Sequence, residues 1–227
     1  MIATTIKSRR ALLSWLTLLF VGHALPLHAG NFEVLVTVTN TNIAEHAVVT
    51  HAVVTLAPLF EHDGASVTTQ TAQMKQREAM FQPFVLSVAV NTPVSFPNFD
   101  QFRHQVYSYS KPKRFELRLY GKEESKHVVF DTAGVVVLGC NIHDNMLTYI
   151  YITHAPYYAV TDENGMTRLA NVKNGTYQMT IWHPDQKDRR QSHTQRIVIH
   201  TESANLKVTM AMRSIRRVQS PPEPDDY

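Results

Sequence analysis

The chain has 227 residues, enough for one large domain or two small ones even after a removable leader is set aside. Residues 1–29 have the three parts of such a leader: a basic start, an apolar run at 11–22, and a small residue, Ala29, at the expected cleavage point. Three of the 22 Lys and Arg residues lie in it and no acid does, so 19 basic residues face 19 acidic ones in the remainder. This balance removes the case for nucleic-acid binding that a pI near 9.0 would otherwise support.

The leader predicts export, and we expect a periplasmic protein. Its apolar run is too short to span a bilayer comfortably, and an uncleaved leader that acts as an anchor is the alternative. No other stretch is apolar enough to be a membrane helix, so no membrane span is expected after the leader is removed. The stretch Ser8–Leu13 also resembles a twin-arginine signal, although the strongly apolar run favours the general secretory route.

Short segments of alternating apolar and polar residues, separated by Gly, Pro and Asn, predict an all-β chain. The expected strands are Phe32–Val38, Ala47–Leu56, Phe84–Val90, Val94–Phe96, His104–Tyr109, Phe115–Tyr120, His127–Phe130, Val135–Leu138, Leu147–Thr153, Leu169–Val172, Thr176–Ile181, Thr194–His200 and Leu206–Met212. Gln70–Ala79 is compatible with a short helix, and Thr161–Gly165 with a hairpin turn. Strands at this spacing indicate a β-sandwich or a barrel. The end of the chain, 214–227, is rich in Pro and acids and is expected to be disordered.

Cys140 is the sole cysteine of the sequence. An exported protein with one cysteine cannot form an internal disulfide, and a free thiol is a liability in an oxidising compartment unless it is buried or bound. The residue is therefore either a small buried side chain or a ligand.

Cys140, His143 and Met146 share one short loop between two expected strands, and His104 begins an earlier strand. Two imidazoles, a thiolate and a distant thioether are the ligands of a type 1 (blue) copper site. Taken singly, each has a simpler explanation: a strand histidine, a turn residue or a core methionine. Zinc could use the cysteine and histidines, but a structural zinc site needs a fourth strong ligand and a catalytic one a bound water. Together the four residues predict one copper per chain and single-electron transfer without catalysis.

The strings HQVYSYS, LGCNIHDNM and YIYI, with Val94–Asp100 before His104, resemble the cupredoxins, in particular the amicyanin- and plastocyanin-like proteins often labelled "methylamine utilization protein". The spacing Cys-x-x-His-x-x-Met is similar to the ligand loop of amicyanin. This resemblance implies a Greek-key β-sandwich and a redox partner, a periplasmic dehydrogenase or a c-type cytochrome, that docks over His143. The family usually has a bulky residue where this chain has Asn145, so we expect a more polar edge here. Asp144 is expected to fix the loop by hydrogen bonds.

Ala159–Pro184 resembles a carboxypeptidase-regulatory-like (prealbumin-like) β-sandwich, and Val34–Pro58 fits the first strands of that module. We therefore expect a cupredoxin domain at 61–155, inserted into a discontinuous sandwich formed by 30–60 and 156–213. Two consecutive domains are the alternative. For function, the alternatives are a copper-binding or copper-delivery protein without electron transfer, and an interaction module with a vestigial site. The basic stretch Lys111–Lys126 is either a solvated face or a surface that steers an acidic partner.

Overall fold

The computed structural model describes residues 32–41, 47–62, 72–122, 124–190, 192–200, 203–213 and 219. All regular secondary structure in these ranges is β, so the predicted all-β class is confirmed. The expected leader and nearly all of the expected disordered tail lie outside the described residues. None of the described segments forms a helix long and apolar enough to cross a membrane.

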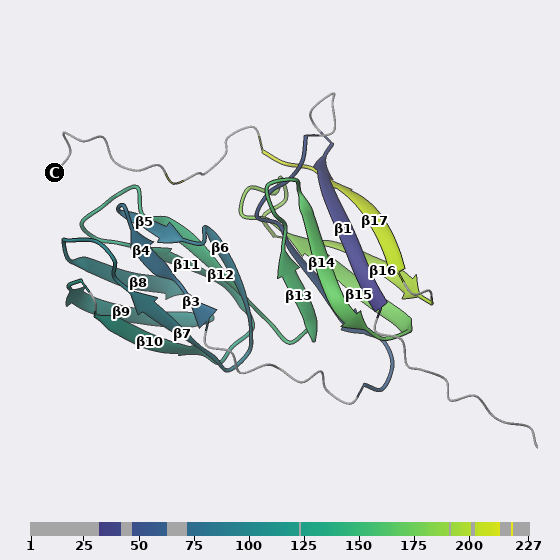
Figure 1. Ribbon diagram of the computed structural model, residues 1–227, viewed down its shortest axis with the longest axis horizontal. Helices are drawn as coiled ribbons and strands as arrows, with labels where there is room; N and C mark the ends of the chain where they lie inside the picture. Colours follow the sequence, from purple (N-terminus) through teal and green to yellow (C-terminus); the bar gives the residue numbers. More distant parts are fainter. Residues whose placement is uncertain are drawn as a thin grey trace, which may run out of the picture.

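Residues 72–153 form what we call the central sandwich (Figure 1). Its strands are β3 (Ala72–Gln73), β4 (Lys75–Arg77), β5 (Met80–Gln82), β6 (Val85–Ala89), β7 (Thr92–Pro97), β8 (His104–Ser110), β9 (Lys113–Tyr120), β10 (Ser125–Phe130), β11 (Gly134–Gly139) and β12 (Leu147–Thr153). The larger sheet has the order β6-β12-β11-β8-β9, the smaller one β10-β7-β3, and β4-β5 is a separate hairpin. Inward side chains of both larger sheets, such as Phe96, Val106 and Ile150, are completely buried in a shared core.

The remaining strands form the flanking sandwich, made from both ends of the described chain (Figure 1). They are β1 (Phe32–Asn40), β2 (Val53–Pro58), β13 (Tyr157–Val160), β14 (Met166–Val172), β15 (Gly175–Trp182), β16 (His193–Ile199) and β17 (Ser203–Met210). Its two sheets have the orders β14-β1-β17 and β13-β2-β15-β16. Their apolar faces, including Leu56, Tyr177 and Met179, enclose a second core. Strands that precede the central sandwich in sequence therefore pair directly with strands that follow it.

Two local predictions were wrong. Residues 72–79, the described part of the expected helix, form β3, β4 and a turn. In β4, Gln76 is buried between the exposed Lys75 and Arg77, which is the alternation of a strand. Three residues are too few for this alternation to be recognised in the sequence. The Thr161–Gly165 turn is present, with Gly165 at φ 68°, but it connects two different sheets and is not a hairpin. Strand β13 before it was not expected from the sequence.

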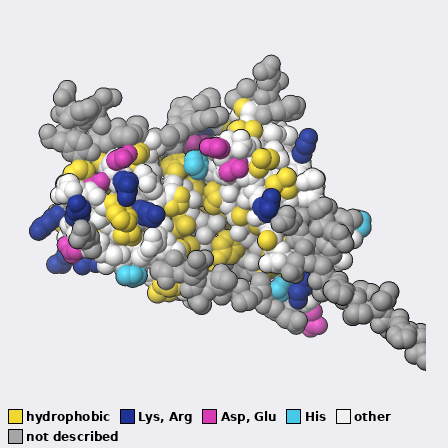
Figure 2. Space-filling view, in the orientation of Figure 1, with side chains coloured by type: hydrophobic (Ala, Val, Ile, Leu, Met, Phe, Trp, Pro, Cys, Tyr) yellow, Lys and Arg dark blue, Asp and Glu magenta, His cyan; other side chains and the backbone are white. Residues whose placement is uncertain are grey.

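The two sandwiches meet along an apolar seam. Val53 and Trp182 of the flanking sandwich are buried against Val85 and Tyr149 of the central one. The indole of Trp182 lies 5.9 Å from the ring of Tyr149 and 5.4 Å from that of Tyr151, so this tryptophan at the end of β15 packs between the sandwiches. Figure 2 shows hydrophobic side chains gathered along this boundary.

The seam makes a measurable contribution to stability. We expect Trp182→Ala to lower the free energy of unfolding by about 3–5 kcal/mol, because a large ring with 8% exposure is removed from a packed contact. Tyr149→Ala combined with it should show a coupling of about 0.5–1.5 kcal/mol in a double-mutant cycle. Urea denaturation measures both values. Val198→Ala, at a side chain that is 62% exposed, is the control and should change stability by less than about 0.5 kcal/mol. A loss below about 1 kcal/mol for Trp182→Ala would contradict this packing.

Candidate metal centre

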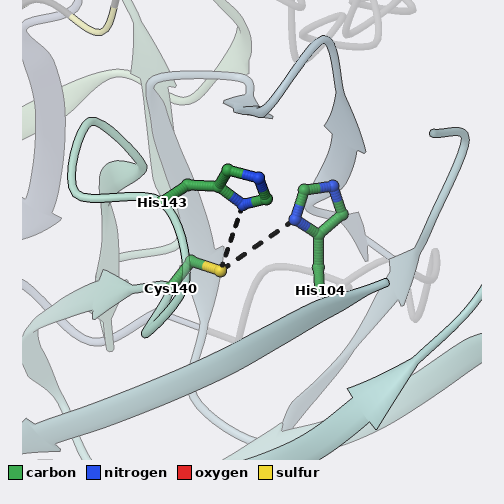
Figure 3. A group of neighbouring side chains, drawn as sticks. All are labelled: His104, Cys140 and His143. Atoms are coloured by element: carbon green, nitrogen blue, oxygen red, sulfur yellow. Dashed lines mark hydrogen bonds between the residues drawn. The ribbon is translucent and has the colours of Figure 1, made fainter. Parts of the chain in front are cut away.

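His104, Cys140 and His143 come together at one end of the central sandwich. One side-chain ligand atom from each residue lies within 4.8 Å of the other two. The Sγ atom of Cys140 is 3.9 Å from Nδ1 of His104 and 3.7 Å from Nδ1 of His143. Figure 3 shows both imidazoles turning the same nitrogen toward the sulfur. Among the residues that the structure describes, this is the one group of Cys, His and acidic side chains with such spacing.

Strand pairing fixes where these side chains lie. His104 is the first residue of β8, and Cys140 directly follows the last residue of β11. The β11–β12 ladder ends at the pair Gly139↔Leu147, so 140–146 is a tight loop, closed by the Met146 N–H donating to the carbonyl of His143 at 3.1 Å. Gly139 pairs with Tyr107 of β8. A glycine is needed there because a Cβ on residue 139 would lie 2.8 Å from the tyrosine ring.

Met146, the predicted fourth ligand, is 2% exposed and belongs to the same apolar core as Cys140. Its side chain therefore faces inward from the loop that carries Cys140 and His143. The role of the thioether as a ligand stays a prediction.

The carboxylate of Asp100 holds the ring of His104. Its Oδ2 atom is 2.7 Å from Nε2 of the imidazole, which leaves Nδ1 to face the sulfur. The same carboxylate accepts the backbone N–H groups of Glu78 at 2.6 Å and Ala79 at 3.1 Å. Both turn residues have left-handed backbones, with φ of 55° and 50°. Such backbones are unfavourable for residues other than glycine, so the carboxylate stabilises a strained turn and orients a histidine at once.

Asp100 replaces Asp144 as the acid that braces the site. Asp144 is exposed, and its side chain makes no hydrogen bond to another described residue, contrary to expectation. Asn145 does brace the ligand loop: its side-chain amide donates to the carbonyl of Ala79 at 3.3 Å. The loop and the His104 partner are thus both attached to the turn at 78–79. The sequence signal for Asp100 was its place four residues before a ligand.

An aromatic residue that the sequence did not single out, Phe102, lies beside both histidines. The ring of Phe102 lies 5.0 Å from that of His104 and 5.2 Å from that of His143. Phe99 is 44% exposed under the guanidinium of Arg77, and Ile142 is 50% exposed. The edge of the site is therefore less polar than Asn145 alone suggests.

Burial and hydrogen bonding shift the ionisation of the three donors. Burial alone would raise the pKa of the Cys140 thiol, but hydrogen bonds from His104 and from the backbone of Gln105 and Ile142 lower it overall. For His104, burial alone would lower the pKa of the imidazole, but its hydrogen bonds with Cys140 and Asp100 raise this pKa overall. The pKa of His143 is lowered by burial and by the nearby His104. The site thus favours a thiolate, the form that binds metals.

The donor set fits a copper ion. Zinc–sulfur and zinc–nitrogen bonds are about 2.3 and 2.0 Å long, and bonds of similar length that open at about 120° would separate sulfur from nitrogen by about 3.7 Å. The two sulfur–nitrogen distances here, 3.7 and 3.9 Å, are close to that value. A thiolate with two imidazoles is the equatorial set of a type 1 copper site. His104, Cys140 and His143 could therefore hold copper with little movement.

Comparison with known proteins gives a partial likeness. No family profile and no curated protein matches the sequence. Among solved structures, a copper-containing nitrite reductase from Thermus scotoductus SA-01 is 26% identical over 37% of this chain and 22% of its own length, with a TM-score of 0.35. A purple cupredoxin from Nitrosopumilus maritimus is 20% identical over 36% of this chain and 99% of its own (TM-score 0.33). A reduced Cu(I) amicyanin mutant is 18% identical over 44% of this chain and 98% of its own (TM-score 0.35).

These structural neighbours are cupredoxins and a copper enzyme, at low identity, and each covers less than half of this chain. The carboxypeptidase-regulatory-like character of the flanking sandwich has no counterpart among these three and stays a prediction.

The role of Asp100 can be tested in the metal-free protein. We expect Asp100→Asn to lower the pKa of His104, because the neutral amide no longer stabilises the imidazolium. The titration of the ring, followed by NMR of the imidazole, should move to lower pH. Asp144→Asn removes an equal charge from the exposed position and is the control. An unchanged His104 titration in Asp100→Asn would show that the carboxylate does not hold the ring.

Proposed function

We propose that this protein is a periplasmic type 1 copper protein that carries single electrons between redox partners. The observation that supports this most directly is the approach of two Nδ1 atoms to one cysteine sulfur at 3.7 and 3.9 Å. In the proposal, one copper per chain is held by His104, Cys140 and His143, with Met146 as a weak axial ligand. When bound, copper changes between Cu(II) and Cu(I) and so stores one electron.

The protein's part is to keep the ligands in one arrangement. The side chains of His104 and Cys140 are 0% and 5% exposed. The hydrogen bond between Asp100 and Nε2 of His104 restrains the imidazole. A rigid, water-poor ligand set changes little between oxidation states, which favours electron transfer over substrate chemistry. The proposal therefore includes no catalytic residue.

We infer that the central sandwich is the copper domain and that it is inserted into the flanking sandwich, because β2 and β13 pair across it. Periplasmic location rests on the expected leader at 1–29, which the structure does not describe. The proposed partner is a periplasmic dehydrogenase or a c-type cytochrome that docks over His143, where Phe102 and Ile142 supply apolar contact.

Loading with copper tests the proposal directly. Purified protein should bind one copper and show an intense visible band from the Cu(II)–thiolate pair, and Cys140→Ser should lose the band while keeping the β fold by circular dichroism. A copper-delivery site without an equatorial thiolate would not give this colour. Wild-type protein that binds Cu(II) and stays colourless would exclude a type 1 site.

The axial role of Met146 has its own test. Met146→Leu should retain copper and colour but raise the reduction potential, because a weak thioether still donates charge to Cu(II). Met74→Leu is a matched control, since Met74 is a fully buried methionine in the same core. Cyclic voltammetry should give an unchanged potential for the control. Complete loss of copper from Met146→Leu would contradict a weak axial ligand.

Electron entry over His143 predicts sensitivity at the exposed edge of the site. Ile142→Ser should slow electron self-exchange, measured by NMR line broadening in mixtures of the oxidised and reduced protein, because it removes apolar contact between docked copies. The visible spectrum should not change. Val198→Ser, an exposed site on the flanking sandwich, should leave the rate unaltered. Equal rates in both variants would place electron entry elsewhere, for example along the basic stretch Lys111–Lys126.

A further inference from the structure

A hollow of about 420 Å³ opens along the seam between the two sandwiches, and none of its lining residues is a predicted copper ligand. Tyr151 and His154 line it from the central sandwich, and Trp182, Arg189, Arg190 and Ser192 line it from the flanking one. Small-molecule sites usually have about 300–1,000 Å³ and often lie where two structural units meet. The hollow has the size and position of a small-ligand site.

The basic side chains of this hollow form no ion pair with the residues that the structure describes. No Asp or Glu is among its lining residues. Arg189, Arg190 and His154 are exposed, and their side chains make no hydrogen bond or ion pair with any residue that the structure describes. Asp185 is paired with Arg213 at 3.0 Å. Asp188 is the nearby carboxylate in sequence, and it accepts the backbone N–H of Arg190 at 2.9 Å without an ion pair to either guanidinium group. Two adjacent unpaired guanidinium groups at one cavity favour an anion.

The wall beside these arginines is aromatic. The rings of Tyr151 and Trp182 lie 5.4 Å apart with an angle of 39° between their planes, and Val135 lies beside them. Tyr151 and Val135 are half-buried, whereas Trp182 is 8% exposed and reaches the hollow with its edge. A flat apolar body can lie against such a wall, whereas the guanidinium groups bind a carboxylate through paired N–H donors. A fully hydrated anion such as phosphate would gain nothing from the rings.

We propose that this hollow binds a small planar organic carboxylate, with Arg189 and Arg190 on the carboxylate and Tyr151 and Trp182 against the body of the ligand. The site is independent of the copper centre, since the lining residues and the donor set do not overlap. Ligand binding at the junction of the sandwiches would be a second role of the protein, which electron transfer does not require.

The chain offers a built-in reporter for this site. Of its two tryptophans, Trp15 lies in the expected leader and Trp182 lines the hollow. The protein without the leader, or the Trp15→Phe variant if the leader is retained, therefore has Trp182 as its one indole. We would titrate this protein, free of metal, with benzoate, with benzamide as its uncharged analogue and with inorganic phosphate, and follow tryptophan fluorescence. Benzoate should change the emission saturably and bind at least roughly tenfold more tightly than the other two compounds.

Charge variants separate this site from general electrostatics. Arg189→Gln with Arg190→Gln should weaken benzoate binding by roughly tenfold or more. Arg196→Gln with Lys207→Gln removes two exposed positive charges outside the hollow and should change the affinity by less than about twofold. Equal binding of benzamide would overturn the role of the arginines, and equal binding of phosphate would overturn the role of the rings. An equal loss in both double variants would reduce the effect to surface charge and overturn the proposal.

Discussion

The carboxylate of Asp100 is the contact on which the geometry of the metal centre depends. It is 92% buried and has three N–H partners: the backbone of Glu78, the backbone of Ala79 and the imidazole of His104. A buried carboxylate is costly unless it is hydrogen-bonded, so these three groups must stay in place together. Because Asn145 also bonds to the carbonyl of Ala79, the turn at 78–79 links the strand histidine to the loop that carries the other donors.

The positions of the other donors depend on where strands β11 and β12 end. The β11–β12 ladder brings Cys140 and Met146 out at the same edge of the sheet, and the loop between them is too short to place His143 anywhere else. His104 arrives on β8, which pairs with β11 at Tyr107↔Gly139. The glycine at 139 leaves room for the ring of Tyr107, which a Cβ there would approach to 2.8 Å. The sheet therefore positions the donors, and the hydrogen bonds of Asp100 select the ring nitrogen that faces the sulfur.

The sequence predicted the parts of this arrangement that depend on local pattern. Strand β12 was predicted with its observed bounds, and His104, Cys140 and His143 were chosen because their residue types and spacing fit one metal. Asp100 was missed because its role depends on the turn at 78–79, which lies more than 20 residues upstream and within a segment taken for a helix. The contacts of Trp182 with Tyr149 and Tyr151 join strands about 30 residues apart, and no periodicity in the sequence encodes such a pairing. The predicted hydrogen bonds of Asp144 are not formed, because a position next to His143 in the sequence does not direct the carboxylate toward the loop.

The pairing of β2 with β13 has a consequence for how the chain folds. Leu56 and Tyr157 are partners in one ladder, although the whole central sandwich separates them in sequence. Closing a flexible loop of that length costs on the order of 4 kcal/mol in chain entropy before any contact offsets it. A central sandwich that folds first holds its own two ends near each other and removes most of this cost. We therefore expect the central sandwich to become structured before the strands on either side of it pair with each other.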